Sequence, residues 1–328
     1  MDVRALTKMF PIRRGLVEII RKAPPRYVHA VDDISFDIIA GEVFGVVGES
    51  GSGKTTTGRL VLRLIEPTSG RILFDGTDIT RVSMDRLRSL RKKMQMIFQD
   101  PYASLNPRYT LARTLEEPLL IHKSSEDARE RLELICRALD EVRLTPASEF
   151  LEKYPHELSG GQRQRVAIAR ALVLKPKLIV ADEPVSMLDV SVRAEILELM
   201  EKVKEKHDLT IFFITHDLSL ARYFCDRIAV MYLGKIVETA PSDIVEKPVH
   251  PYTKALVAAV PEPDPSNRDK RREIKVKGEI PSATAPPAGC RFHPRCMYMT
   301  DSCKEVEPQP VEVERGHFVA CHNYQTVN

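Results

Sequence analysis

Short apolar segments recur along this chain and predict the strands of a mixed α/β protein. Residues 3–10 and 31–38 show partial alternation of apolar and polar side chains, which is typical of strands with one buried face. Further strands are predicted where apolar runs end in a glycine or a polar residue, at 43–48, 70–80, 94–99, 177–183 and 209–216. Residues 227–238 are predicted to form a hairpin that turns at Gly234.

Helical periodicity replaces this pattern between about residues 100 and 175. Within 125–142, apolar residues recur at spacings of four, three, four and three, and these are Ala128, Leu132, Ile135, Leu139 and Val142. This spacing places them on one helix face, which we expect to pack in a core. The expected N-cap of this helix is Ser124 or Ser125.

Composition is that of an ordinary soluble globular protein. The 328 residues give room for one large domain and a smaller one, and 43% are apolar and 29% charged. The net charge of +3 is spread through the sequence and leaves no basic footprint for nucleic acid. No apolar run reaches the ~18 residues that span a bilayer, and residues 1–14 lack a signal-peptide core, so we expect a cytoplasmic protein. The basic segment 11–26 is expected to be an exposed insertion, with contact to lipid headgroups or a partner as the alternative.

A glycine-rich turn carries the strongest functional signal. Gly48, Gly53, Lys54 and Thr55 fit the phosphate-loop pattern GxxxxGK[ST], between a predicted strand and a helix predicted at 55–64. In such a loop, backbone N–H groups and the helix N-terminus bind a di- or triphosphate. Lys54 is expected to reach the β- and γ-phosphates, and Thr55 to hold Mg²⁺. Unless this is a plain turn, the residues expected to contact nucleotide are Gly48, Ser50, Gly51, Ser52, Gly53, Lys54, Thr55 and Thr56.

Two strand ends and a second glycine turn add candidate residues. One strand ends in Asp182 and Glu183, and in phosphate-loop enzymes the first such acid steadies Mg²⁺ while the second polarises an attacking water. His216 ends the next strand, where an imidazole can hydrogen-bond a γ-phosphate. The turn 158–162 opens a helix predicted at 162–174, and its hydroxyl and bare N–H groups form a second phosphate-seeking surface. The alternatives are solvated acids at a strand end and a structural histidine.

Four of the six cysteines lie near the C-terminus, and these are Cys290, Cys296, Cys303 and Cys321. The region after residue 260 is proline-rich and too short to build much core alone, which favours a metal staple. The spacings x5, x6 and x17 are wider than in most zinc sites, while four thiolates also suit an iron–sulfur cluster, and free or oxidised thiols are a third interpretation. Histidines near enough in sequence to substitute in a zinc site are His293, His317 and His322. Cys136 and Cys225 are expected to be buried thiols.

Taken in order, these motifs resemble the ATP-binding subunit of an ABC transporter over residues 1 to about 240. The matching positions are Phe10 (adenine-stacking aromatic), 48–56 (Walker A), Gln99 (Q-loop), 158–162 (signature), Asp182 and Glu183 (Walker B), Asp189 (D-loop) and His216 (switch histidine). An aromatic such as Phe10 is otherwise more often a core residue. Val185 and Met187 replace the usual threonine and alanine near the D-loop.

The resemblance implies a particular α/β fold. It comprises a phosphate-loop (RecA-like) ATPase core, an antiparallel β subdomain and an α-helical signature subdomain at about 100–175. The implied domains are a nucleotide-binding domain at 1–240 and a small cysteine-rich C-terminal extension at 241–328.

The resemblance also implies a shared reaction chamber. Family members pair head to tail, so ATP lies between one Walker A loop and the partner's signature, here Ser159, Gly161 and Gln162. Glu183 would orient the attacking water, with Lys54 and His216 stabilising the developing charge. The implied Mg²⁺ ligands, direct or through water, are Thr55, Gln99 and Asp182.

Finer likeness points to the oligopeptide/dipeptide importer branch, through segments 99–107, 154–158 and 250–256. The intact signature and residues 6–11 resemble its F-type ATPase subunit. This implies a distinct D-type ATPase as partner, two transmembrane permease subunits, an extracytoplasmic solute-binding protein and a peripheral position on the cytoplasmic face of the membrane. The alternative is a soluble ABC ATPase acting on nucleic acid or ribosomes, but such proteins usually carry two cassettes, coiled coils or basic arms, and none appears here.

The branch also has a Gly-Cys-x-Phe-x-Pro-Arg-Cys pattern, which residues 289–296 match. In that family four cysteines hold a [4Fe–4S] cluster, and the corresponding residues are Cys290, Cys296, Cys303 and Cys321. Zinc is the alternative occupant. A cluster that senses redox state and tunes the ATPase is a further hypothesis.

Overall fold

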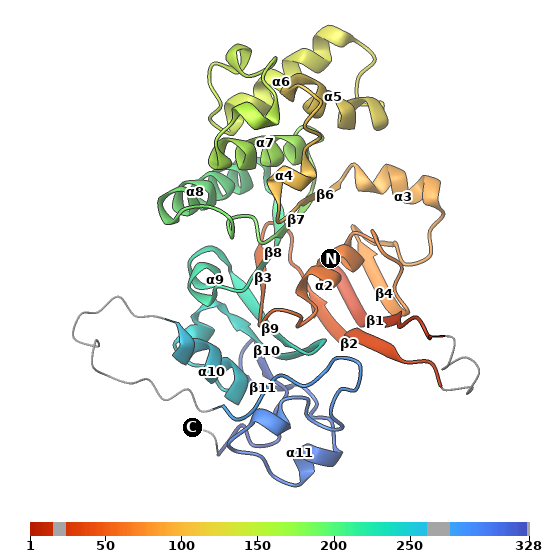
Figure 1. Cartoon of the computed structure of the whole chain (residues 1–328), viewed down its shortest axis with the longest axis vertical. Coiled ribbons are helices and arrows are strands. Elements are labelled where there is room, and N and C mark those ends of the chain that lie inside the picture. The colour runs from red at the N-terminus through yellow and green to blue at the C-terminus, as the bar shows by residue number, and fades with distance from the viewer. Residues whose placement is uncertain (16–23, 261–275, 327–328) are drawn as a thin grey trace, which may run out of the picture. The chain divides into compact units, whose positions relative to one another are not determined.

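The computed structural model describes residues 1–15, 24–260 and 276–326, coloured along the chain in Figure 1. The chain divides into two compact units. The first comprises residues 1–37, 44–80 and 215–328, and the second comprises 38–43 and 81–214. Half of the predicted basic insertion, residues 16–23, lies outside the described residues.

An antiparallel four-stranded sheet of the first unit confirms the two alternating strands of the sequence. Its order is β2-β1-β4-β5, with bounds β1 Asp2–Pro11, β2 Tyr27–Asp37, β4 Ser69–Phe74 and β5 Thr77–Asp78. Val3 of β1 lies opposite Phe36 on one side and Ile72 on the other, and all three side chains are buried. The apolar positions of the alternating pattern therefore face a core, as the sequence predicts.

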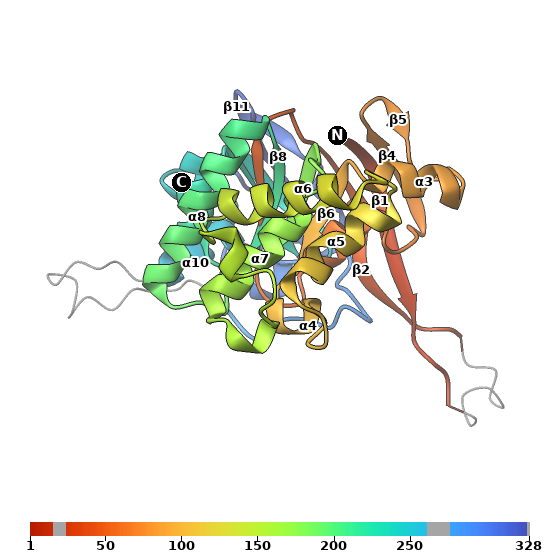
Figure 2. The ribbon, with the colours of Figure 1, turned by 90° about the horizontal axis from the view of Figure 1, so that it is seen from above.

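A second set of strands in the first unit runs in the order β11-β12-β10-β9-β3. β3 (Val43–Val47) pairs in parallel with β9 (Arg227–Tyr232), and β9 forms a hairpin with β10 (Lys235–Pro241). Gly234 turns this hairpin at a φ of 80°, which confirms the predicted turn. Helices α2 (Lys54–Val61) and α9 (Leu218–Phe224) belong to the same unit. Both are labelled in Figure 1, and Figure 2 gives the same ribbon seen from above.

The C-terminal part of the first unit consists of short elements. They are the 3₁₀ turn η3 (Ser242–Val245), α10 (Pro251–Ala259), the 3₁₀ turn η5 (His293–Arg295), α11 (Ser302–Glu305), β11 (Val311–Glu314) and β12 (His317–Val319). Tyr232, Tyr252 and Phe292 form a buried aromatic cluster, with ring centroids 4.7 to 5.4 Å apart. This cluster joins the hairpin, α10 and the chain after residue 276 into one packed body.

The second unit contains three parallel strands in the order β8-β7-β6 and most of the helices. The strands are β6 (Met94–Ile97), β7 (Leu178–Asp182) and β8 (Thr210–Thr215). The helices are α3 (Met84–Arg91), α4 (Pro101–Ser104), α5 (Leu111–Ile121), α6 (Ala128–Glu141), α7 (Gly160–Leu172) and α8 (Val190–His207), with 3₁₀ turns η1 (Ala147–Glu149) and η2 (Pro155–Glu157). Throughout the described ranges of both units, we find no helix whose length and apolar character suit a membrane span.

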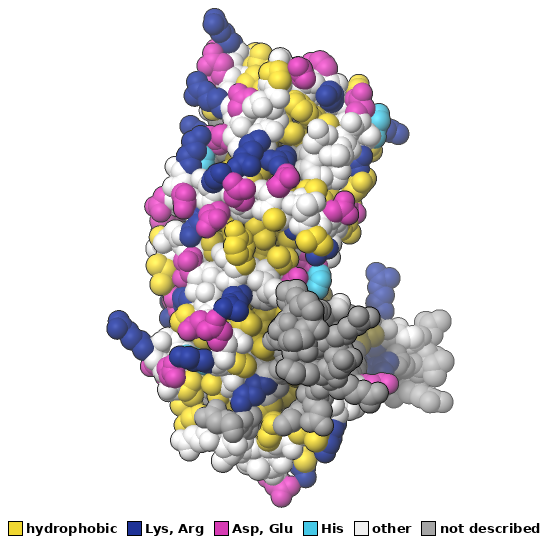
Figure 3. Space-filling view, turned by 90° about the vertical axis from the view of Figure 1, so that its left-hand side faces the viewer, with side chains coloured by type: hydrophobic (Ala, Val, Ile, Leu, Met, Phe, Trp, Pro, Cys, Tyr) yellow, Lys and Arg dark blue, Asp and Glu magenta, His cyan; other side chains and the backbone are white. Residues whose placement is uncertain are grey.

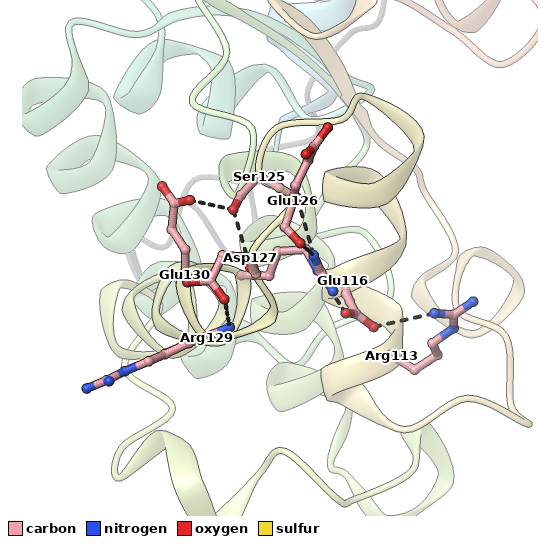
Figure 4. Close-up of polar contacts among 8 residues, drawn as sticks. Arg113, Glu116, Ser125, Glu126, Asp127, Arg129 and Glu130 are labelled. Carbon is pink, nitrogen blue, oxygen red and sulfur yellow. Dashed lines mark hydrogen bonds and ion pairs between the residues drawn. The ribbon is translucent and has the colours of Figure 1, made fainter.

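The start of α6 corrects one sequence prediction. Asp127, rather than Ser124 or Ser125, is the N-cap, and its carboxylate accepts the Arg129 N–H at 3.0 Å. Figure 4 shows the Ser125 hydroxyl turned instead toward Glu130. Serine and aspartate are both good N-caps, so composition alone could not choose between neighbouring candidates.

The predicted apolar stripe of α6 is also narrower than expected. Ile135, Leu139 and Val142 are buried, but Leu132 is 46% exposed.

On the face drawn in Figure 3, basic and acidic side chains are interspersed, in keeping with the spread of charge along the sequence.

Candidate functional site

The phosphate-loop pattern lies between β3 and α2 in the first unit, where the sequence predicts it. Gly53 has a φ of 108°, and a Cβ there would lie 2.2 Å from the Ala30 carbonyl oxygen. A Cβ at Gly48 would lie 2.1 Å from the Met231 carbonyl oxygen. Both positions require glycine because the neighbouring atoms are backbone and cannot move aside.

The loop is shaped to receive an anion. Lys54 is buried, and its Nζ donates to the carbonyl oxygens of Gly48 and Glu49 at 2.8 and 3.0 Å, which holds the ammonium across the loop. Gly53 is the N-cap of α2 and supplies no side-chain cap, so α2 begins directly at the loop and directs the positive end of its dipole there. Ser52 is 2% exposed, yet its Oγ has no hydrogen-bond partner among the described residues. A helix N-terminus, a buried ammonium and the orphaned Ser52 hydroxyl fit the oxygens of a polyphosphate.

Two further predicted residues belong to the same unit. His216 follows β8 directly and is exposed. Phe10, near the end of β1, is 37% exposed, and the Lys8 ammonium lies 5.0 Å from its ring centroid. Phe10 is therefore not a core residue, and the exposed face of its ring can stack on a planar group such as a nucleotide base.

The second unit brings Gln99 and Glu183 together. β7 ends at Asp182, which is 3% exposed, and Glu183 turns the chain with a φ of 46°. Its N–H donates to the Ile214 carbonyl at 3.0 Å, so the turn is tied to β8. The Gln99 amide then donates to the Glu183 carboxylate at 3.1 Å. A buried carboxylate followed by a partly exposed one at a strand end suits Mg²⁺ binding and water activation.

The second glycine turn differs from its prediction. α7 begins at Gly160 rather than Gln162, so both glycines lie within the first helical turn. The Ser159 hydroxyl accepts the Gln162 N–H at 3.3 Å, and the Gln162 side chain accepts the Ser159 N–H at 3.0 Å, which is a capping box. The N–H groups of Ser159 and Gln162, predicted to be bare, are therefore already partnered. A Cβ on Gly161 would lie 2.8 Å from Val192 Cγ1, so this glycine serves close packing against α8.

Asp189 is exposed at the N-cap of α8 and makes no side-chain capping bond in the described part of the chain. Val185 is buried and Met187 is 58% exposed. Arg193 is not among the residues predicted from the sequence, and its guanidinium donates to the carbonyl oxygens of Leu188 and Ser186 at 2.7 and 3.3 Å. It shapes the segment before Asp189, and no motif marks it.

The four C-terminal cysteines line one small cavity. Burial, and secondarily the neighbouring thiols, raise the pKa of Cys290 to about 12 and that of Cys321 to about 11. Within residues 1–15, 24–260 and 276–326, no group of three or more His, Cys, Asp or Glu side chains is arranged to hold a metal ion. The donor set is therefore gathered at one place, but the thiols are not in ligating positions.

Other predictions for this region are partly wrong. Of the three histidines named for a zinc site, His293 and His322 line the cavity, but His317 bonds the buried Glu238 carboxylate at 2.7 Å instead. Cys225 is buried as predicted, whereas Cys136 is only partly buried.

The first unit carries a phosphate loop at the N-terminus of α2, and the second unit carries a Mg²⁺-type carboxylate and an adjacent candidate base. These are the features of nucleoside triphosphate hydrolases. A further glycine turn that opens α7 is the additional mark of the ABC class.

Comparison with known proteins identifies the family. Residues 31–186 match the family profile of ABC transporters, and residues 237–303 match the profile of the oligopeptide/dipeptide transporter C-terminal region. The chain is 50% identical to the oligopeptide transport ATP-binding protein AppF of Bacillus subtilis, over 99% of this chain and 97% of that protein. It is 49% identical to a putative peptide import ATP-binding protein of Brucella ovis, over 98% and 96% respectively. The chain belongs to the ABC transporter family, as an ATP-binding subunit of its oligopeptide/dipeptide importer branch, and it is an ATPase.

Solved structures support the same fold. The dimeric ATP-binding cassette MJ0796, in a post-hydrolysis state with ADP and phosphate, matches with a TM-score of 0.63 and 30% identity, over 74% of this chain and 98% of that one. A second match is cbiO1 of Clostridium perfringens, with a TM-score of 0.63 and 28% identity, over 75% and 90%. The ABC cassette fold with mixed sheets is therefore shown.

Proposed function

We propose that this chain is the F-type ATPase of a peptide importer and pairs head to tail with a distinct D-type ATPase. The names of its relatives, which are peptide import and oligopeptide transport ATP-binding proteins, support a peptide cargo. The remaining partners are two transmembrane permease subunits and an extracytoplasmic solute-binding protein. The chain then sits peripherally on the cytoplasmic face of the membrane.

In this proposal the loop Gly48–Thr56 holds the phosphates of ATP and Phe10 stacks on the adenine. The N-terminus of α2 at the loop, the buried Lys54 ammonium and the orphaned Ser52 hydroxyl support the phosphate role. Ser159, Gly161 and Gln162 close the partner's site, with Asp189 at the shared interface.

Hydrolysis follows from the pair at the end of β7. Glu183 accepts a proton from the attacking water, and Lys54 and His216 stabilise the charge that develops on the γ-phosphate. The Gln99 contact at 3.1 Å is the single observation that carries this step, because it holds the Glu183 carboxylate in place beside the Q-loop. Movement of Gln99 then reports the state of the site to the permease.

Mg²⁺ is expected with ATP, and the residues present fit it. The Thr55 hydroxyl stands in the first turn of α2, and Asp182 is a buried carboxylate, which are the hard oxygen ligands that Mg²⁺ prefers. Gln99 is the third proposed ligand. The ion would neutralise charge on the β- and γ-phosphates when bound.

The domain division is proposed at residue 240. The C-terminal family match at 237–303 supports an extension of 241–328, following a nucleotide-binding domain of 1–240. Within the latter, the β2-β1-β4-β5 sheet corresponds to the antiparallel subdomain and the helices between about 100 and 175 to the signature subdomain.

The same extension is proposed to bind a [4Fe–4S] cluster, with zinc as the alternative. Convergence of Cys290, Cys296, Cys303 and Cys321 on one cavity supports this. Their thiols must shift and lose protons to ligate. Anaerobic purification should yield a brown protein with about four irons per chain. A colourless protein with one zinc would instead select the alternative.

The hydrolytic proposal is tested by Glu183→Gln in the assembled transporter. Hydrolysis should fall by ~10²–10⁴ while MgATP binding survives, since only proton acceptance is lost. Turnover at the normal rate would show that Glu183 is not the base. Co-purification with nucleic acid, in place of integral membrane subunits, would contradict the importer assignment.

A further inference from the structure

Glu49, the second residue of the phosphate loop, is anchored by residues far along the chain. Its carboxylate accepts hydrogen bonds from two nitrogens of Arg295, at 2.8 and 3.1 Å. Such a two-pronged contact between guanidinium and carboxylate is strong and directional. Arg295 lies in η5, next to Cys296. In the sequence it stands within the cysteine pattern 289–296, and nothing in that pattern indicates a contact with the phosphate loop.

Packing fixes the guanidinium. The Arg295 side chain is 11% exposed, and its guanidinium carbon lies 5.7 Å from the Tyr232 ring centroid and 5.8 Å from that of Phe292. Tyr252, from the same buried cluster, accepts the Glu49 N–H with its hydroxyl at 2.9 Å. Glu49 is therefore held by both its side chain and its backbone.

The chain between residues 280 and 283 shares a cavity with the loop. Ile280, Pro281 and Ala283 line a cavity of about 180 Å³ together with the loop residues 49–52. The Ala283 carbonyl also accepts the His29 N–H at 2.9 Å, which ties this wall to β2. All these residues belong to the first compact unit, so the contacts describe one packed body.

The charge of Glu49 makes this anchoring matter. A carboxylate inside a phosphate loop repels the triphosphate that the loop binds. Paired with a guanidinium, the carboxylate no longer presents an unbalanced negative charge, and its orientation is fixed by two hydrogen bonds.

We propose that Arg295 is a positioning residue for nucleotide binding, which neutralises and orients Glu49 so that the phosphate loop accepts ATP. The inference rests only on ATP binding by this subunit and is independent of the cargo. It assigns the C-terminal extension a part in the ATP site of its own chain.

The test is MgATP affinity of the full-length chain, measured with a fluorescent ATP analogue and by competition with ATP. Arg295→Ala should weaken affinity by about tenfold, because the Glu49 charge is left unbalanced near the phosphates. The double variant R295A/E49Q should recover most of the affinity, since the charge is then gone. Higher salt should shrink the R295A defect, because it screens the repulsion. Glu49→Gln alone should bind at least as tightly as the unaltered chain.

Lys235→Ala is the matched control, because the Lys235 ammonium forms its ion pair with Glu307 of the same extension and not with Glu49. It should leave MgATP affinity unchanged. Unchanged affinity in R295A would overturn the proposal. The proposal would also be overturned if R295A weakened MgATP affinity and neither Glu49→Gln nor higher salt restored it. That result would show that Arg295 supports the fold but does not act through the charge of Glu49. ATP binding by the unaltered chain tests the proposed function separately, so the two ideas can fail independently.

Discussion

The two glycine turns of this protein look alike in sequence but are built on opposite principles. In the phosphate loop, Gly48 and Gly53 avoid backbone atoms of β9 and β2 that lie about 2 Å from where a side chain would begin. The α2 N-terminus has no side-chain cap from Gly53. In the signature turn, Gly160 and Gly161 are helical, and Ser159 with Gln162 caps the helix internally.

The difference teaches that a helix N-terminus is not by itself a completed anion site. The phosphate loop contains the buried Ser52 hydroxyl, which has no hydrogen-bond partner among the described residues. In the signature turn, Ser159 and Gln162 already bond each other, so in the proposed head-to-tail dimer the Ser159 hydroxyl would have to exchange or share its capping bond with the partner's nucleotide. This difference suits a mechanism in which ATP binds to the phosphate loop first and is contacted by the signature turn of a partner afterwards.

The largest expected effect is on the phosphate loop. Gly48→Ala should destabilise the chain by about 3 kcal/mol or more and abolish ATP binding. The added methyl group would lie only 2.1 Å from the Met231 carbonyl oxygen, which is backbone and cannot move aside. Denaturant unfolding and nucleotide binding measure this. Gly51→Ala is the control: its φ is 79°, but nothing lies within 4 Å of the added carbon, so about 1 kcal/mol is expected. Equal losses in the two variants would contradict the comparison.

A smaller effect is expected at Gly161. Its added methyl meets only Val192 Cγ1, the end of a side chain, and its φ is not left-handed. Gly161→Ala should therefore cost about 1–2 kcal/mol of unfolding free energy. In Val192→Ala background the cost should largely disappear, and failure of that rescue would show that the glycine is required for another reason.

The smallest effect concerns the cap. Ser159→Ala should lower stability by about 1 kcal/mol through loss of the bond to the Gln162 N–H. Ser159→Asp keeps a capping oxygen and should restore stability, yet its charge should still depress ATP hydrolysis in the assembled transporter. If Asp restored hydrolysis as well, Ser159 would act only as a cap.

Local signals in the sequence predicted much of the fold. Alternation located β1 and β2, the glycine at 234 located the hairpin, and the GxxxxGK[ST] pattern located the loop before α2. Such features depend on residues close in sequence, where sterics and periodicity act directly. The predicted N-cap of α6 was wrong because Ser124, Ser125 and Asp127 are all suitable capping residues and lie close together in the sequence.

Contacts between distant residues could not be predicted. The pairing of Arg295 with Glu49 spans 246 positions, and that of His317 with Glu238 spans 79. The left-handed backbone of Glu183 is likewise set by its bond to Ile214 on the neighbouring strand. No local preference encodes any of them, because each forms only once the fold brings the partners together.

The surroundings of Glu238 bear on where the chain can be cut. This carboxylate is 1% exposed and accepts the N–H groups of Val249 and His250 at 2.8 and 3.0 Å, in addition to its bond to His317. A gene fragment ending near residue 240 would remove all of these donors and would leave the buried ring of Tyr232 without Tyr252 and Phe292, so it should be much less stable than the full chain. The proposed domain boundary is therefore not a suitable site for truncation. A minimal cassette that ends there should be recovered from cells as insoluble material.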